Sequence, residues 1–251
     1  MDKIRISAVK YANTFPFIYG LSESGLENKA VIETDHPADC AEKLITGKAD
    51  IGLIPVAVLP LLKEYHLLSD YCIGAVRNVR TVLLLSNTPF EDIKSIYLDY
   101  RSRTSVNLVR VLAKNFWNRD FRWISTSPEF NFTDIAAGEA VVLIGDQCFE
   151  FENNFLYRID LAGAWIEFTG LPFVFAAWTA NKIINDDFLS EFNEALGIGI
   201  MNIDAVVERF GKSGSIKGND LKEYLTVNID YVFDEHKKEG LALFLELVSK
   251  L

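Results

Sequence analysis

A turn rich in arginine and hydroxyl side chains is the clearest candidate for chemistry in this sequence. Residues 99–106 read DYRSRTSV and lie between a predicted strand and a predicted helix. One hydroxyl would suffice to cap that helix, because one side-chain oxygen satisfies one orphan N–H group. Three hydroxyls, the positive end of the helix dipole and Arg103 together indicate a site for a carboxylate, with Thr104 and Ser105 as direct contacts. Neighbouring positions point to different faces, so at most one of Arg101 and Arg103 needs to face the ligand.

Four further segments place polar groups near the ends of predicted strands. Asn13 follows the first strand, where its amide suits either a turn or a bound hydroxyl or carboxylate. Pro55 begins a helical segment and leaves the N–H of Val56 free to face a cleft. Thr81 begins an apolar strand and is either a simple β-former or a group lining a hinge. Asp146 ends another apolar strand, where it either caps the next helix or faces the ligand.

Composition excludes several classes of function. The chain has 251 residues and a formal net charge of −10, which argues against a nucleic-acid or anionic-membrane surface. Its three cysteines lie far apart without a CxxC pair, so neither a disulfide framework nor a zinc site is predicted. Its three histidines form no catalytic triad pattern and no metal-ligand spacing. The turn at 99–106 lacks the glycines and Gly-Lys-Ser/Thr run of a nucleotide-phosphate loop.

No targeting or membrane segment is predicted. The sequence starts directly with an alternating strand pattern, without the charged, apolar and small-residue regions of a signal peptide. No stretch reaches the roughly 18 apolar residues that a membrane-spanning helix needs. We therefore expect a cytoplasmic protein that binds neither membrane nor nucleic acid.

The hydrophobic pattern predicts an α/β fold built from two similar β-α-β-α-β halves, each with a parallel sheet covered on both faces. Strands 81–86 and 173–180 are the natural crossings between two lobes. The first lobe is predicted to comprise 1–86 and 178–251, and the second is an insertion at 87–177. Ligands in such sheets bind beyond the carboxyl ends of the strands, which predicts a ligand cleft between the lobes. The elements expected are strands at 4–8, 31–34, 50–55, 72–76, 81–86, 95–99, 123–126, 140–146 and 173–180, and helices at 17–21, 37–46, 56–65, 104–117, 133–137, 186–209, 218–225 and 234–250.

Five segments, taken together and in order, resemble the chorismate dehydratases of the futalosine route to menaquinone. They are YANTFPFIYGL, GKADIGLIPVAVL, LDYRSRTSVNLVRVL, VVLIGD and DLAGAWIEFTGLPFVFAAW. The resemblance implies the fold of type II periplasmic binding proteins, which agrees with the two-lobed prediction. It also implies that chorismate, a small dicarboxylate, loses water to give 3-[(1-carboxyvinyl)oxy]benzoate. Because the product is aromatic, the reaction needs no redox cofactor and no metal.

The resemblance also assigns roles to the candidate residues. Asn13 and Thr81 are the expected catalytic pair, holding the enolpyruvyl carboxylate of the substrate over its ring. Serine is frequent in the family at the position of Thr81, so the hydroxyl is kept and a methyl is added. The general base is either that substrate carboxylate or a protein group. The expected substrate-binding residues are Pro55, Val56, Arg103, Thr104, Ser105 and Asp146.

Two alternatives stay open from the sequence. A dihydroxynaphthoate synthase of the same pathway would share the fold, but it is expected to use a histidine base. A non-catalytic solute-binding protein for a small carboxylate would also share the fold, but it would normally carry an export signal.

Overall fold

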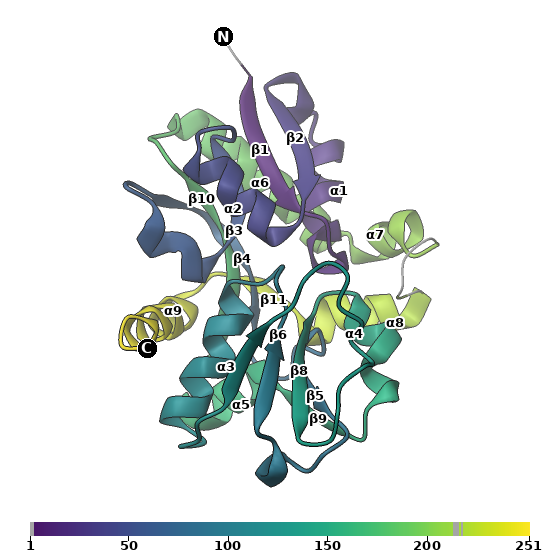
Figure 1. Cartoon of the computed structure of the whole chain (residues 1–251). Coiled ribbons are helices and arrows are strands. Elements are labelled where there is room, and N and C mark those ends of the chain that lie inside the picture. Colours follow the sequence, from purple (N-terminus) through teal and green to yellow (C-terminus); the bar gives the residue numbers. More distant parts are fainter. Residues whose placement is uncertain (1–2, 213–215, 217) are drawn as a thin grey trace.

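The computed structural model describes residues 3–212, 216 and 218–251 and shows an α/β protein with two lobes, each built on one sheet (Figure 1). The two-lobed α/β class was predicted correctly. The proposed boundaries of the lobes, 1–86 with 178–251 and 87–177, stay a prediction. Within the described residues, no helix is long and apolar enough to cross a membrane.

Over the described residues, the first sheet has six strands in the order β11-β4-β10-β3-β1-β2. The first three strands of the chain run parallel, whereas β10 runs antiparallel to both of its neighbours. This sheet is therefore mixed, and the expectation of a parallel sheet was wrong for its crossing strand. The strands are β1 (Ile4–Val9), β2 (Ala30–Asp35), β3 (Ile51–Pro55), β4 (His66–Ala75), β10 (Phe173–Ala180) and β11 (Asp230–Val232).

The second sheet, counted over the same residues, has five strands in the order β7-β6-β8-β5-β9. Its arrangement repeats that of the first sheet, because three parallel strands are followed by an antiparallel strand, β5. The two strands predicted as crossings, β5 and β10, thus occupy equivalent places in the two sheets. The strands are β5 (Val82–Ser86), β6 (Ser95–Leu98), β7 (Arg122–Ser125), β8 (Glu139–Ile144) and β9 (Tyr157–Asp160).

Helices cover the sheets and close the junction between the lobes. Helix α9 contacts β10 in the first lobe and α3 in the second (Figure 1). The α-helices are α1 (Phe15–Glu23), α2 (Pro37–Ile45), α3 (Thr104–Asn115), α4 (Gln147–Phe151), α5 (Leu161–Thr169), α6 (Asp186–Met201), α7 (Ile203–Phe210), α8 (Gly218–Glu223) and α9 (Glu235–Val248). Short 3₁₀ helices are η1 (Ala12–Thr14), η2 (Leu26–Asn28), η3 (Val56–Leu61), η4 (Phe90–Asp92) and η5 (Glu152–Asn154), and η6 (Tyr224–Asn228) is a π-helix.

Several local predictions differ from the structure for identifiable reasons. The segment after β3 forms only a 3₁₀ helix, since Pro60 lies inside it and cannot donate a helical hydrogen bond. The helix expected at 186–209 is broken at Asn202, whose ψ of 42° is not helical. Residues 133–137 form no helix: 133 and 137 lie in turns, and 134–136 are irregular. Strands β9 and β11 and helix α4 were missed, and all three are short. Helix α5 was also missed, although it is as long as α1 and α2.

The segment GIGIM at 197–201 allows two helices to pack closely. Helix α6 crosses α1, and a Cβ atom added at Gly199 would lie 1.6 Å from the carbonyl oxygen of Pro16. A Cβ atom added at Gly20 would similarly lie 1.9 Å from the carbonyl oxygen of Ala195. Glycine is therefore required on both helices, which explains these glycines without any nucleotide-binding role.

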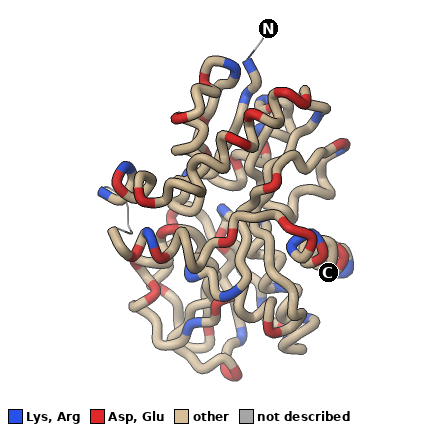
Figure 2. Tube along the Cα trace, turned by 180° about the vertical axis from the view of Figure 1, so that it is seen from behind, with Lys and Arg blue, Asp and Glu red and all other residues tan. Residues whose placement is uncertain are grey.

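Charged residues of both signs are interspersed along the chain (Figure 2). The net negative charge is thus spread over the molecule, and a small site inside it can still be built from hydrogen-bond donors that favour an anion.

Candidate functional site

A cavity lies where the carboxyl ends of strands from both sheets meet the start of α3. The cavity has a volume of about 70 Å³, which is several times the roughly 10–15 Å³ that one buried water needs. Its walls are largely apolar with a few polar groups, as in most small-molecule sites. The lining residues are Val9, Tyr11, Asn13, Pro37, Pro55, Ile73, Val79, Thr81, Val82, Ser102, Thr104, Ser105, Ile144, Gly145, Phe175 and Ala176.

The structure brings together most of the residues expected from the sequence. Those that line the cavity are Asn13, Pro55, Thr81, Thr104 and Ser105. Those that are not part of its lining are Val56, Arg103 and Asp146. The roles of all eight as catalytic or binding groups stay predictions, but five of them share one cavity although they come from four separate segments of the chain.

The hydroxyl residues of the 99–106 turn have three different environments. Ser102 Oγ accepts the N–H of Ser105 at 3.0 Å, so Ser102 caps the first turn of α3. Thr104 Oγ1 donates to the carbonyl of Phe175 at 3.0 Å and accepts the N–H of Ala57 at 3.3 Å. Within the described part of the chain, the Ser105 hydroxyl makes no hydrogen bond. Thr104 therefore joins the lobes, and the Ser105 hydroxyl is available to a ligand.

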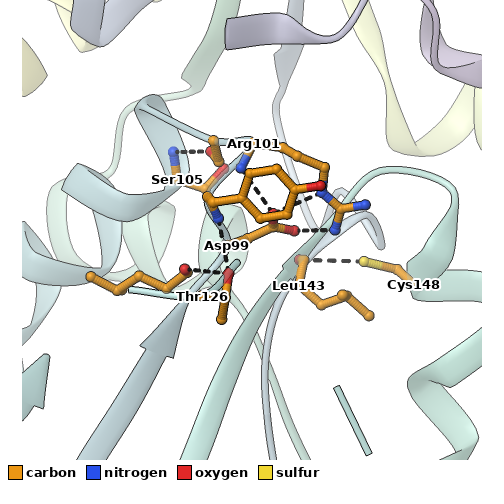
Figure 3. A network of polar contacts seen from close by, with 9 residues as sticks. Asp99, Arg101, Ser105, Thr126, Leu143 and Cys148 are labelled. Carbon is orange, nitrogen blue, oxygen red and sulfur yellow. Dashed lines mark hydrogen bonds and ion pairs between the residues drawn. The ribbon is translucent and has the colours of Figure 1, made fainter. Parts of the chain in front are cut away.

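The two arginines of the turn lie in opposite environments. Arg101 is buried, and its guanidinium forms a two-pronged ion pair with the fully buried carboxylate of Asp99 (Figure 3). The side-chain amide of Gln147, oriented with its oxygen toward Arg101, accepts a further hydrogen bond from the guanidinium. Arg103 is exposed. The ion pair neutralises the charge of Arg101. Arg101 therefore stabilises the conformation of the turn and does not line the cavity.

Asp146 makes a contact that spans the cleft. Its carboxylate accepts the N–H of Ala12 at 3.1 and 3.2 Å, which ties the end of β8 to the residues that follow β1. Burial raises the pKa of Asp146 to about 6, although the Ala12 N–H acts in the opposite direction. Asn13 is the next residue, so this bond helps to fix the backbone of a predicted catalytic position.

Thr81 is positioned by a strained backbone. The preceding residue, Arg80, has a φ of 65°, a left-handed conformation that is uncommon for a residue with a side chain. The Asp160 carboxylate holds the Arg80 N–H at 2.8 Å, and the Thr81 carbonyl accepts the N–H of Gly145 at 2.9 Å. The Thr81 hydroxyl itself lies 2.8 Å from the hydroxyl of Tyr224.

Two polar residues at the site were missed from the sequence: Tyr11 and Tyr224. Tyr11 lines the cavity, and its buried hydroxyl has no hydrogen-bond partner among the described residues. Its ring lies against Gly145, where a Cβ atom would come within 3.0 Å of the ring carbons. Tyr11 lies inside a quoted segment and carried a local signal, whereas Tyr224 lies far away in the sequence and carried none.

Neither histidine chemistry nor a metal centre is indicated at the cavity. No histidine is among the lining residues. Across the described ranges, no group of three or more histidine, cysteine, aspartate or glutamate side chains is placed to hold a metal ion. Among the residues that the structure describes, the lining contains no charged residue, so an anion would be held there by hydroxyl groups, amides and backbone N–H groups.

Residues 4–250 match the family described as menaquinone biosynthesis. The chain belongs to that family. A chorismate dehydratase of Thermus thermophilus is 24% identical over 267 residues, covering 96% of this chain and 93% of the relative. The family match, over residues 4–250, includes every segment that lines the cavity.

Solved structures share the fold of this menaquinone biosynthesis protein. A protein of Archaeoglobus fulgidus has a TM-score of 0.78 at 16% identity, covering 99% of this chain and 97% of its own. A Candida albicans protein, described as having the generic periplasmic binding protein fold, has a TM-score of 0.69 at 13% identity, with 100% and 91% coverage. An alkanesulfonate-binding protein of Xanthomonas axonopodis has a TM-score of 0.68 at 11% identity, with 99% and 92% coverage. The periplasmic-binding-protein-like fold was therefore predicted correctly.

Proposed function

We propose that this member of the menaquinone biosynthesis family is a chorismate dehydratase, a hydro-lyase that converts chorismate to 3-[(1-carboxyvinyl)oxy]benzoate and water. One observation carries the proposal. A single cavity joins the hydroxyl-rich start of α3, which follows β6, and Thr81, which precedes β5 of the same sheet, to Asn13, which follows β1 of the other sheet. The similarity to the Thermus thermophilus chorismate dehydratase supports the choice of substrate.

The start of α3 is the proposed clamp for the ring carboxylate. Ser105 supplies a hydroxyl without a protein partner in the described structure, and the first N–H groups of the helix add the positive end of its dipole. As the proton leaves the ring carbon that bears the ether, negative charge spreads through the ring onto this carboxylate. Fixed donors at this position would stabilise the developing charge.

Asn13 and Thr81 are the proposed holders of the enolpyruvyl carboxylate. In this mechanism that carboxylate takes the proton from the ring carbon and the neighbouring C–O bond breaks. The departing hydroxyl then receives that proton from the carboxylate and leaves as water. The ring becomes aromatic, no electrons are gained or lost overall, and the protein contributes orientation and hydrogen bonds. Asp146 is less suited to act as the base, since it does not line the cavity and its carboxylate is engaged by Ala12.

The test is to incubate the protein with chorismate and to follow the benzoate ether by chromatography and mass. Asn13→Ala and Thr81→Val should each lower kcat by about 100-fold or more, the cost of removing one preorganised donor. Absence of product with the wild-type protein contradicts the proposed activity. Binding of chorismate without turnover would indicate a solute-binding role, and near-wild-type kcat in both variants would contradict the assigned residues.

A further inference from the structure

Two tyrosines from the C-terminal segment contact the proposed catalytic pair, Asn13 and Thr81, on the side away from the cavity. Tyr224 lies 2.8 Å from Thr81, hydroxyl oxygen to hydroxyl oxygen. Tyr231 donates its O–H to the backbone carbonyl of Asn13 at 2.9 Å. Both tyrosines are buried, and neither lines the cavity. The segment after α8 therefore contacts both residues without being placed to touch the substrate.

Tyr224 is held in a fixed position. Its side chain is fully buried, and its ring meets that of Phe149 edge to face, with centroids 5.1 Å apart. Tyr224 also begins the π-helix η6, an irregular element that often occurs at functional sites. Burial raises its pKa, so the phenol keeps its proton. A rigid neutral hydroxyl is thus presented to Thr81.

In the hydrogen bond between Thr81 and Tyr224, the choice of donor decides whether the Thr81 proton is free for a ligand. Each of the two hydroxyls has one proton to donate, so only one of them donates in the bond between them. If Thr81 donated to Tyr224, its proton would be unavailable to the cavity. If Tyr224 donates, the Thr81 proton remains free for a ligand. The side chain of Asn13 also lies near the Tyr224 hydroxyl, and an amide N–H turned toward the phenol oxygen would leave the Tyr224 proton for Thr81.

We propose that Tyr224 is a positioning residue, which donates its O–H to Thr81 and directs the Thr81 proton toward the substrate carboxylate. This inference rests on the proposed dehydratase activity. Without the phenol oxygen, the Thr81 side chain loses the contact that selects its rotamer and the direction of its O–H bond. Misorientation of a group that holds the reacting carboxylate lowers kcat more than it weakens ground-state binding.

The experiment compares four proteins with chorismate as substrate: wild type, Tyr224→Phe, Thr81→Val and the double variant. Tyr224→Phe should lower kcat by about 10- to 100-fold and change KM by no more than about twofold. In the Thr81→Val background, the same change should have almost no further effect, because Tyr224 acts through Thr81. Tyr97→Phe is the matched control, since it removes a hydroxyl bonded to Glu139 outside the cavity.

The outcomes separate the proposed dehydratase activity from the positioning role of Tyr224. No turnover by the wild type contradicts the dehydratase and this inference with it. Turnover with a wild-type kcat in Tyr224→Phe contradicts the inference alone, as does an equal loss in both backgrounds. If Tyr224→Phe is too unstable to assay, the double variant against Thr81→Val gives the same test, because both partners are then apolar and neither is left unsatisfied. Equal kcat values support the inference, and a further loss contradicts it.

Discussion

Removing the negative charge of Asp99 should destabilise the protein strongly. Asp99 Oδ1 accepts the backbone N–H of Arg101 at 3.1 Å and its Nε at 2.8 Å, and Oδ2 accepts Nη2 at 2.5 Å. In Asp99→Asn the Oδ1 bonds are kept, but an NH₂ group replaces Oδ2 and faces the Nη2 donor. The Arg101 cation, only 8% exposed, is left without its counter-charge.

The size of the expected loss in unfolding free energy follows from the burial of this ion pair. Breaking a buried ion pair costs about 3–5 kcal/mol, and the two retained bonds place this substitution near 3 kcal/mol. A protein of this size loses about 2–4 °C in Tm per kcal/mol, so we expect a fall of about 6–12 °C. Thermal and urea unfolding of the ligand-free protein measure the loss directly.

Asp50→Asn is the matched control. Asp50 is also buried, accepts two hydrogen bonds from the guanidinium of Arg5 and forms an ion pair with Lys182 at 2.7 Å. The Arg5 and Lys182 side chains are 50% and 55% exposed, so both cations stay hydrated when the charge of Asp50 is removed. Its loss should be smaller, about 1–2 kcal/mol. If Asp99→Asn destabilises no more than Asp50→Asn, burial of the Arg101 charge is not what the ion pair compensates, and the reasoning is refuted.

Two further substitutions should stabilise the ligand-free protein. Tyr11→Phe removes a buried hydroxyl without a partner in the described structure, so the free energy of unfolding should rise by about 1 kcal/mol. The KM for chorismate should increase. A lower stability of the variant would show that the protein satisfies this hydroxyl. Asp146 has a folded pKa of about 6 against about 3.9 unfolded, so the folded state holds the proton more tightly and stability falls as pH rises from about 4 to 6. Asp146→Asn should flatten that slope and add about 2–3 kcal/mol at pH 7, measured by urea unfolding across the pH range; an unchanged slope would contradict the assignment.

Local patterns in the sequence were sufficient for the framework of the site. Alternation and apolar runs located most strands, and the carboxyl ends of parallel strands converge by geometry. Asn13 and Pro55 could therefore be assigned to one cleft without knowing the order of the sheets, and Thr81 was assigned to it because it begins a strand that crosses between the lobes. Proline at the start of α2 fixed that helix for a similarly local reason.

Contacts between distant segments could not be predicted in this way. Tyr224 meets Thr81 across 143 positions, and the Asp146 carboxylate meets Ala12 across 134. Nothing in the composition around Tyr224 distinguishes it from a core tyrosine. Even the short-range Asp99–Arg101 pair was ambiguous, because DYRSRTSV does not reveal which arginine turns inward.

The position of Arg101 explains how an acidic protein can carry a site for a dicarboxylate. The charge of Arg101 is neutralised by Asp99, and the described residues that line the cavity are all neutral. Anion recognition then depends on hydroxyls and helix N–H dipoles, which are held in place before the ligand arrives. These dipoles act over short distances inside a cavity that excludes most water, where they are strong, and the charge of −10 spread over the surface is screened by solvent. A neutral lining also binds the carboxylates of the ground-state substrate less tightly than a charged lining would. Its hydrogen-bond donors can then interact most strongly with the negative charge that develops in the transition state.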